Sequence, residues 1–346
     1  MKTLEKKERF FRCIEREEVD RPPIWLGIPT SQAMPALNRH FGTSNYTDMK
    51  LRCNDDVWNV SCTYNAPNSR LIEDPFEFAA GHTATDAAER TLTERGCFAE
   101  CEDPEEIEDF AWPDTAEYID REGCLAQLKD IPKGYPVLGV LWASHFQLAC
   151  SAFGMEDALI AMKLYPEVFK AVIDKITEFY LRAGEVYYST MKGKLDAVLI
   201  GNDFGTQNGL LTSPDDLREF VFGGTRQFIE QAHSYGLKVI HHSCGAISEV
   251  IPDLIACGAD VIHPIQASAA GMQAEKLKER FYGQVSFCGG LDAQYLLVNG
   301  SAEDVRKRTR ELAELFPTGL IISPSHEAIL PDIPVENVSA MLTALD

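Results

Sequence analysis

Along the chain, short apolar runs alternate with longer amphipathic stretches, most regularly from residue 117 onward. The short runs are rich in Val, Ile and Leu and predict buried strands, which span 136–141, 196–201, 260–263, 284–288 and 319–323, with one more opening the segment 237–245. The stretches between them predict helices over 117–130, 145–165, 166–192, 223–235, 247–256, 272–280, 302–315 and 334–345, and a helix that begins at 212–216. Strands that alternate with helices in this way run parallel and are joined by helical crossovers. The number of units favours one closed (β/α)8 TIM barrel, an α/β fold, over a two-domain Rossmann arrangement.

The N-terminal part is less regular and predicts an elaboration of the barrel. Its expected elements are a helix over 3–18 ended by Pro22 and Pro23, a strand over 24–27, a helical region over 30–51, a strand over 56–64 and hairpin character over 83–93. We expect residues 1–346 to form a single domain, with this irregular N-terminal elaboration inside residues 1–130.

The segment 237–245, LKVIHHSCG, carries the most suggestive chemistry. Side chains on a strand alternate between its two faces, so His242 and Cys244 share one face while His241 lies on the other. An imidazole and a thiol at a strand end make half of a zinc site. The alternative is a core histidine bonded to backbone beside an inert buried thiol.

The remaining candidates come from the other strand ends, because active sites of such barrels lie at the C-terminal ends of the strands. A catalytic zinc takes three protein ligands, and we predict His326 as the third. Its alternative role is to support the ligands or bind substrate. Cys288 is the competing third ligand, and its alternative is a small buried residue at a tight turn.

Further residues at these ends are predicted to act on the substrate. Asp203 is the predicted catalytic residue, handling substrate or a proton, and its alternative is an ion pair or helix cap, since burying an unpaired carboxylate is costly. The predicted substrate-binding residues are Trp142, His145, Asn202 and Gln207. His263 is predicted to be structural, and His241 to pack behind the barrel or bond a ligand residue.

Composition narrows the classes of function. A formal net charge of −21 argues against nucleic acid or an anionic membrane as the main partner. The charged N-terminal segment lacks a signal-peptide core, and no apolar run reaches the roughly 18 residues of a membrane span, so we expect a cytoplasmic protein. In a reducing cytosol its ten cysteines would be free thiols or metal ligands. Dinucleotide-binding and P-loop glycine motifs are absent from the sequence.

A sulfur ligand narrows the classes of reaction that a zinc site here is expected to catalyse. Zinc stabilises a bound thiolate and can polarise a leaving atom as a Lewis acid, whereas hydrolytic zinc sites mostly use His and carboxylate ligands. A site containing His242 and Cys244 therefore favours activation of a thiol or of a methyl donor over hydrolysis.

The chain resembles the uroporphyrinogen decarboxylase-like superfamily, particularly its zinc-dependent, corrinoid-linked methyltransferase branch. The motifs that carry the resemblance lie at 6–23 (KKERFFRCIEREEVDRPP), 202–207 (NDFGTQ), 212–220, 241–245 (HHSCG), 253–266, 287–297 (FCGGLDAQYLL) and 322–338 (ISPSHEAILPDIPVENV). In that branch an H-x-C pair and a later cysteine hold zinc. His242 and Cys244 match the pair, and His326 stands where the later cysteine is expected. The arginine-rich segment that holds porphyrin carboxylates in the decarboxylase branch is replaced by the arginine-free residues 27–32.

The resemblance implies a (β/α)8 barrel that moves a methyl group between a small methylated compound, or a thiol or pterin acceptor, and a corrinoid protein. The expected cofactors are Zn2+ in this chain and cobalamin on a partner, because no D-x-H-x-x-G corrinoid motif occurs here. A homodimer is expected by analogy. Two alternatives stay open: a metal-independent decarboxylase of a small carboxylate or porphyrinogen, with Asp203 as the key acid, and a barrel that binds a ligand or a corrinoid protein without turnover.

Overall fold

The computed structural model describes residues 3–65, 75–76, 78 and 94–346. The hairpin expected over 83–93 lies outside these residues. Within them the strands are β1 (Ile28–Pro29), β2 (Trp58–Ser61), β3 (Val137–Val140), β4 (Ala197–Gly201), β5 (Lys238–His242), β6 (Val261–Ile265), β7 (Ser286–Leu291), β8 (Leu320–Pro324) and β9 (Ala328–Ile329).

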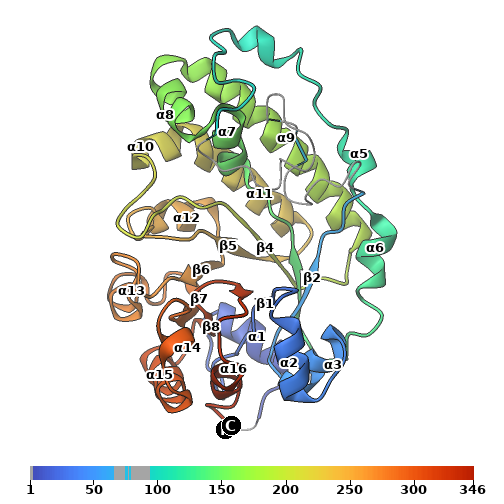
Figure 1. Cartoon of the computed structure of the whole chain (residues 1–346), viewed down its shortest axis with the longest axis vertical. Helices are drawn as coiled ribbons and strands as arrows, with labels where there is room; N and C mark the ends of the chain where they lie inside the picture. Colours follow the sequence, from blue (N-terminus) through green and yellow to red (C-terminus); the bar gives the residue numbers. More distant parts are fainter. Residues whose placement is uncertain (1–2, 66–74, 77, 79–93) are drawn as a thin grey trace.

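A parallel sheet in the order β2-β3-β4-β5-β6-β7-β8 forms the centre of the fold (Figure 1). Residues 23–26 fill the remaining place between β8 and β2. The Trp25 N–H donates to Ile322 O at 2.9 Å, and the Asp56 N–H donates to Ile24 O at 2.7 Å. These bonds close a TIM-barrel-like α/β fold, which confirms the predicted fold class, although the predicted strand 24–27 is reduced to a single bridge at Ile24.

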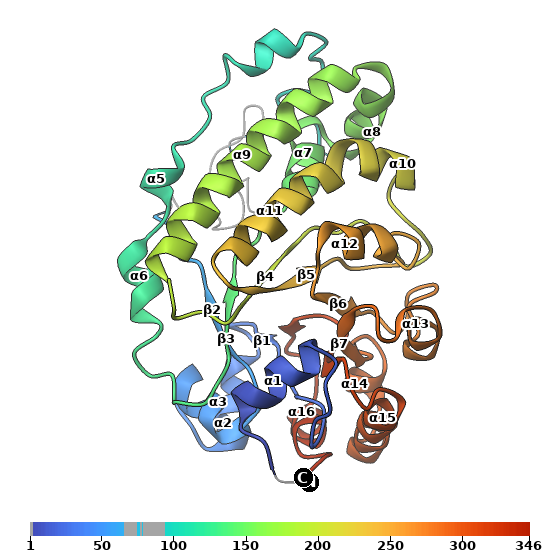
Figure 2. The ribbon, with the colours of Figure 1, turned by 180° about the vertical axis from the view of Figure 1, so that it is seen from behind.

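Helices cover the outside of the sheet, with α7, α9 and α11 along one side and α13 to α16 along another (Figure 2). They are α1 (Lys6–Ile14), α2 (Met34–Phe41), α3 (Tyr46–Cys53), α5 (Thr115–Tyr118), α6 (Arg121–Ala126), α7 (His145–Phe153), α8 (Met155–Leu164), α9 (Pro166–Thr190), α10 (Pro214–Asp216), α11 (Phe222–Ser234), α12 (Ile251–Cys257), α13 (Ala274–Phe281), α14 (Leu296–Asn299), α15 (Ala302–Leu315) and α16 (Val335–Leu342), with a 3-10 helix over Pro104–Ile107 and a π-helical turn over Leu217–Val221.

The barrel interior is a separate apolar layer below the strand ends. Its buried side chains include Leu138, Leu199, Ile240, Val261, Cys288 and Ile321, one from each of six strands. The alternate positions of these strands, such as Val198, Val239 and Ile262, pack outward against the helices. The alternation predicted for residues 237–245 is therefore present: Ile240 and His242 face inward and His241 faces outward.

Several predicted helices are broken in the structure. The region 30–51 contains two helices, because Gly42 ends α2 in a left-handed conformation (φ +67°) and Asn45 caps α3 by accepting from the Asp48 N–H. The predicted helix 117–130 is split into α5 and α6, and Asp120 caps the second of these. Ser213 accepts from the Asp216 N–H, as expected of the N-cap of α10.

Candidate functional site

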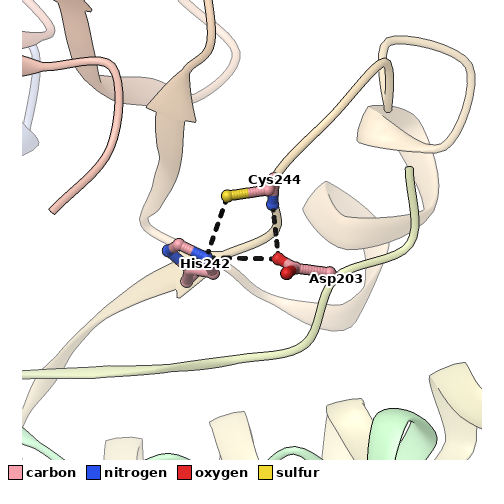
Figure 3. A group of neighbouring side chains, drawn as sticks. All are labelled: Asp203, His242 and Cys244. Atoms are coloured by element: carbon pink, nitrogen blue, oxygen red, sulfur yellow. Dashed lines mark hydrogen bonds and ion pairs between the residues drawn. The ribbon is translucent and has the colours of Figure 1, made fainter. Parts of the chain in front are cut away.

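Asp203, His242 and Cys244 come together where β4 and β5 end (Figure 3). His242 Nε2 lies 3.4 Å from Cys244 Sγ and 3.2 Å from Asp203 Oδ1. Asp203 Oδ1 also accepts from the Cys244 backbone N–H at 2.8 Å. One donor atom from each residue lies within 4.8 Å of the other two, a spacing at which the three could bind one metal ion.

The close approach of the two strand ends depends on Gly201. Its φ is +152°, and a Cβ at this position would lie 2.0 Å from the His242 carbonyl oxygen. A side chain there would push β4 away from β5. Glycine therefore allows the segment that carries Asp203 to run directly beside the segment that carries His242 and Cys244.

Gln147 of α7 holds Asp203 from the side opposite the metal candidates. Its Oε1 accepts from the Asp203 N–H at 3.1 Å, and its Nε2 donates to Asp203 Oδ2 at 3.4 Å. Burial by itself raises the pKa of Asp203, but the hydrogen bond to His242, its charge and the Cys244 N–H outweigh burial and leave this pKa below its usual value. Asp203 is thus an ionised carboxylate fixed at its Oδ1 toward His242.

The other edge of the His242 ring faces two residues from β6 and from the turn after β8. His242 Nδ1 lies 3.0 Å from His263 Nδ1 and 3.5 Å from Glu327 Oε2. Burial lowers the pKa of His263 well below its usual value, so this ring is neutral. Burial also opposes protonation of His242, but Glu327, Asp203 and Cys244 together raise its pKa well above the usual value. The surroundings of His242 therefore stabilise positive charge.

His326 lies beside Cys244 at the exposed side of the site. A hydrogen bond to Cys244 raises the pKa of His326, burial opposes this increase, and Glu327 adds to it. Its ring centroid is 6.4 Å from that of His242, and its Nδ1 accepts from the Ala328 N–H at 3.0 Å. The structure thus brings His326 to the thiol, although its nitrogens lie outside the mutual 4.8 Å set formed by Asp203, His242 and Cys244.

Cys288 occupies a different position. Its side chain is fully buried in the inner apolar layer, and its Sγ lies 3.3 Å from Ser323 Oγ. Burial raises its pKa to about 12, which disfavours the thiolate needed for metal binding. Among the described residues, neither of the two groups spaced to hold a metal includes Cys288.

The four predicted substrate-binding residues lie in three different environments. Trp142 contacts the site, with its ring edge-on to His242 at a centroid distance of 5.1 Å. His145 is fully buried outside the barrel, where its ring nitrogens face Ala143 O at 3.3 Å and Val221 O at 3.0 Å. Asn202 is buried beside it and accepts from the Phe146 N–H. Gln207 lies on an exposed loop and donates to Gln294 Oε1 at 3.0 Å.

Sequence reasoning missed Glu327 and Gln147 and regarded His263 as structural. The sequence contained a signal for Glu327, because it lies directly after His326 and both residues follow the end of β8. Gln147 had no such signal, since it lies inside a helix and reaches the site only through the packing of α7.

Comparison with known proteins places these residues in a family context. Residues 98–346 match the family model for uroporphyrinogen decarboxylase (URO-D). The methylated-thiol–coenzyme M methyltransferase of Methanosarcina mazei is 28% identical over 209 residues, which cover 59% of this chain and 53% of that protein. The uroporphyrinogen decarboxylase of Chlamydia trachomatis is 26% identical over 181 residues, covering 52% of this chain and 50% of that protein. The chain thus spans about half the length of these curated relatives.

A solved structure of a methyltransferase from Methanosarcina mazei shares the fold. The two superpose with a TM-score of 0.71 at 16% identity, over 99% of this chain and 98% of the other. Within the described part of the chain, no helix has both the length and the apolar character needed to cross a membrane.

Proposed function

Because this chain belongs to the uroporphyrinogen decarboxylase (URO-D) family, we propose that it is a zinc-dependent methyltransferase. The methyl group moves between a small methylated compound, or a thiol or pterin acceptor, and a corrinoid protein that carries cobalamin on a separate chain. The methyltransferase among its relatives supports the reaction class. The protein is further proposed to be a single-domain cytoplasmic enzyme that forms a homodimer.

The observation that carries the proposal is the donor set around His242 Nε2. A thiol sulfur lies at 3.4 Å and a carboxylate oxygen at 3.2 Å from this nitrogen, and nitrogen, sulfur and oxygen are the three ligand atoms that zinc takes in proteins. Among the described residues, the ion-pair partners of Asp203 and Glu327 are histidines, with no Lys or Arg. A bound cation would pair with these carboxylates in place of protonated histidine, and the residues present fit zinc.

Zinc bound here would stabilise an acceptor thiolate or polarise the heteroatom that carries the methyl group. The chain's own residues prepare the site for this chemistry. Asp203, ionised and held by Gln147, accepts or orients the proton of the incoming substrate. Trp142 lies against His242 and supplies an apolar wall that limits water at the reacting atoms.

His242 and Cys244 are proposed as two zinc ligands, and His326 as the third. Asp203 competes for this third place, because its oxygen already lies in the mutual donor set. Cys288 is the weaker competitor, because it is buried in the inner layer with its thiol protonated.

Metal analysis tests the proposal directly. Protein purified without added zinc should contain about one zinc per chain, and Cys244→Ser should lose most of it. His326→Ala should also lower the zinc content, while Cys288→Ser should not. If Asp203→Asn lowers the content and His326→Ala does not, Asp203 is the third ligand. An active protein without zinc contradicts the proposal.

The reaction class is tested with a methylated corrinoid protein and a panel of thiol acceptors, followed by mass spectrometry of the methylated product. Uroporphyrinogen is assayed in parallel, since uroporphyrinogen decarboxylases are also among the relatives. Decarboxylation without methyl transfer would favour the decarboxylase alternative. Binding of the corrinoid protein without turnover of any kind would favour a non-catalytic barrel.

A further inference from the structure

The edge of His242 that faces away from Cys244 lies in a second group of donor atoms. One donor atom each from His242, His263 and Glu327 lies within 4.8 Å of the other two. The two ring nitrogens are 3.0 Å apart, and the carboxylate oxygen is 3.5 Å from His242 Nδ1. Two ligand atoms bound to one tetrahedral zinc at about 2.1 Å lie roughly 3.4 Å apart. The 3.5 Å distance is close to this spacing, whereas the 3.0 Å between the ring nitrogens is shorter, so the two rings would move apart slightly around a shared cation.

Hydrogen bonding within the protein does not satisfy this group. A single proton between the two Nδ1 atoms makes one hydrogen bond, and the Glu327 oxygen is then left without a donor. That oxygen is buried and has no hydrogen-bond partner, and its ion-pair contacts are His242 Nδ1 at 3.5 Å and His326 Nδ1 at 3.6 Å. The His263 ring is fully buried as well, and its Nδ1 is the ring nitrogen that faces this group. A buried carboxylate oxygen without a donor is costly, and a metal ion removes this cost.

The two groups are distinct, because they use different nitrogens of one ring. Asp203 and Cys244 face Nε2, whereas His263 and Glu327 face Nδ1. The first group includes sulfur, and the second consists of two imidazoles and one carboxylate. Two histidines and a glutamate are a ligand set of catalytic zinc sites and, with open positions, of mononuclear iron sites.

We propose that His242 Nδ1, His263 Nδ1 and Glu327 Oε2 form a second site for a divalent transition-metal ion, joined to the Asp203–Cys244 site by the shared His242 ring. The proposal does not depend on methyl transfer and shares with the proposed function only the ligand His242. Filling both sites makes His242 a bridging ligand, and its ring protons leave to solvent as the ions bind.

Titration of metal-free, chelator-treated protein with Co2+ separates the two sites. Cobalt bound to a thiolate gives a charge-transfer absorption band, whereas cobalt bound to nitrogen and oxygen does not. We expect two Co2+ per chain by equilibrium dialysis, of which one produces the band. His263→Leu and the isosteric Glu327→Gln should keep the band and weaken binding of the other ion about tenfold or more. Cys244→Ser should lose the band and still bind one ion.

His241→Leu is the matched control, because it removes a buried histidine from the neighbouring outward-facing position of the same strand, and it should bind two ions. The inference is overturned if the wild type binds one ion with the band and His263→Leu and Glu327→Gln bind it equally well. Two ions in every variant would also overturn it. If the proposed zinc site does not bind metal, the result is different. The wild type then shows no charge-transfer band and binds one Co2+, and Glu327→Gln weakens the binding of that ion.

Discussion

Asp203 is held by contacts from three directions, and these contacts fix the orientation of its carboxylate in the site. His242 and the Cys244 N–H contact Oδ1, while Gln147 bonds both the backbone N–H and Oδ2 of Asp203. Residues that orient a metal ligand or its neighbour commonly affect metal affinity as strongly as some ligands do. On the proposed function, Gln147 is a positioning residue that acts through Asp203.

Gln147→Leu should lower zinc affinity by about 10- to 100-fold, because Asp203 loses the two hydrogen bonds that the Gln147 side chain makes to its backbone N–H and to Oδ2. Competition with a zinc chelator measures this change. Gln227→Leu is the matched control, since Gln227 is an exposed glutamine whose Nε2 donates within its own helix to Gly223 O. Equal zinc affinity in both variants would show that Asp203 is oriented without Gln147.

At the scale of elements, α1 and the turn after it are tied to the closing segment 23–26 by buried charges. Arg9 bonds Asp20 through Nε at 2.8 Å and Asp56 through Nη1 at 2.8 Å. Asp56 also accepts from Arg21 Nη1 at 2.6 Å and from the Ile24 N–H at 2.8 Å. This network holds the short segment where a full eighth strand would otherwise pair, so it stabilises barrel closure.

Asp20 makes part of this stability depend on pH. Burial opposes its ionisation, but the hydrogen bonds from Arg9 and from the Leu4 N–H lower its pKa to about 2. Because the folded pKa lies below the unfolded value of about 3.9, the contribution is complete above roughly pH 5 and is lost as pH falls toward 2. Asp20→Asn should thus cost about 1–2 kcal/mol at pH 7 and progressively less at lower pH, as measured by urea unfolding. Asp332→Asn, a change at an exposed site, should lower the free energy of unfolding little at pH 7 or at lower pH. If the loss for Asp20→Asn does not depend on pH, the ionic explanation is refuted.

Asp56→Asn should be more damaging, because it leaves the buried charge of Arg9 partly unpaired and weakens the bond to the Ile24 N–H. Removing one member of a buried ion pair costs about 3–5 kcal/mol. Chemical unfolding at pH 7 measures the loss, with Asp332→Asn again as the exposed control. A loss below about 1 kcal/mol would mean that the backbone bonds at Ile24 close the barrel on their own.

At the scale of the whole molecule, the stabilising core and the candidate site are separate layers. The inner apolar layer lies below the strand ends, and the polar groups around His242 lie at those ends. Barrels of this kind keep their catalytic groups on the face away from the stabilising contacts. The fold should therefore not depend on metal, in contrast to small domains that fold only when zinc is bound.

Removal of zinc by chelation should abolish methyl transfer and leave the circular dichroism spectrum unchanged. The free energy of unfolding should fall only by the binding contribution, about 4 kcal/mol when free zinc exceeds its dissociation constant a thousandfold, and the melting temperature should fall accordingly. Calorimetry with and without chelator measures this, and restored zinc should return both properties. Loss of the helical signal on chelation would instead make the metal a structural element.

Local pattern alone determined most of the architecture. Runs of Val, Ile and Leu separated by amphipathic helices identified the strands β3 to β8, because burial on both faces of a parallel strand requires apolar side chains at successive positions. Alternation along residues 237–245 also placed His242 and Cys244 on one face, since side-chain direction on a strand is a local property. The breaks in the helices over 30–51 and 117–130 were missed, because caps such as Asn45 and Asp120 act through hydrogen bonds that periodicity does not reveal.

Only the tertiary structure decided which distant residues meet His242. Asp203, His263 and Glu327 come from three other strand ends, and their distances depend on strand register and on close contacts such as that at Gly201. The same packing left Cys288 one layer below the site and His145 outside the barrel, although both follow or lie in predicted strands. Sequence spacing determines which face of a strand a residue occupies, whereas the depth of that residue in the barrel is determined by how neighbouring strands are offset against one another.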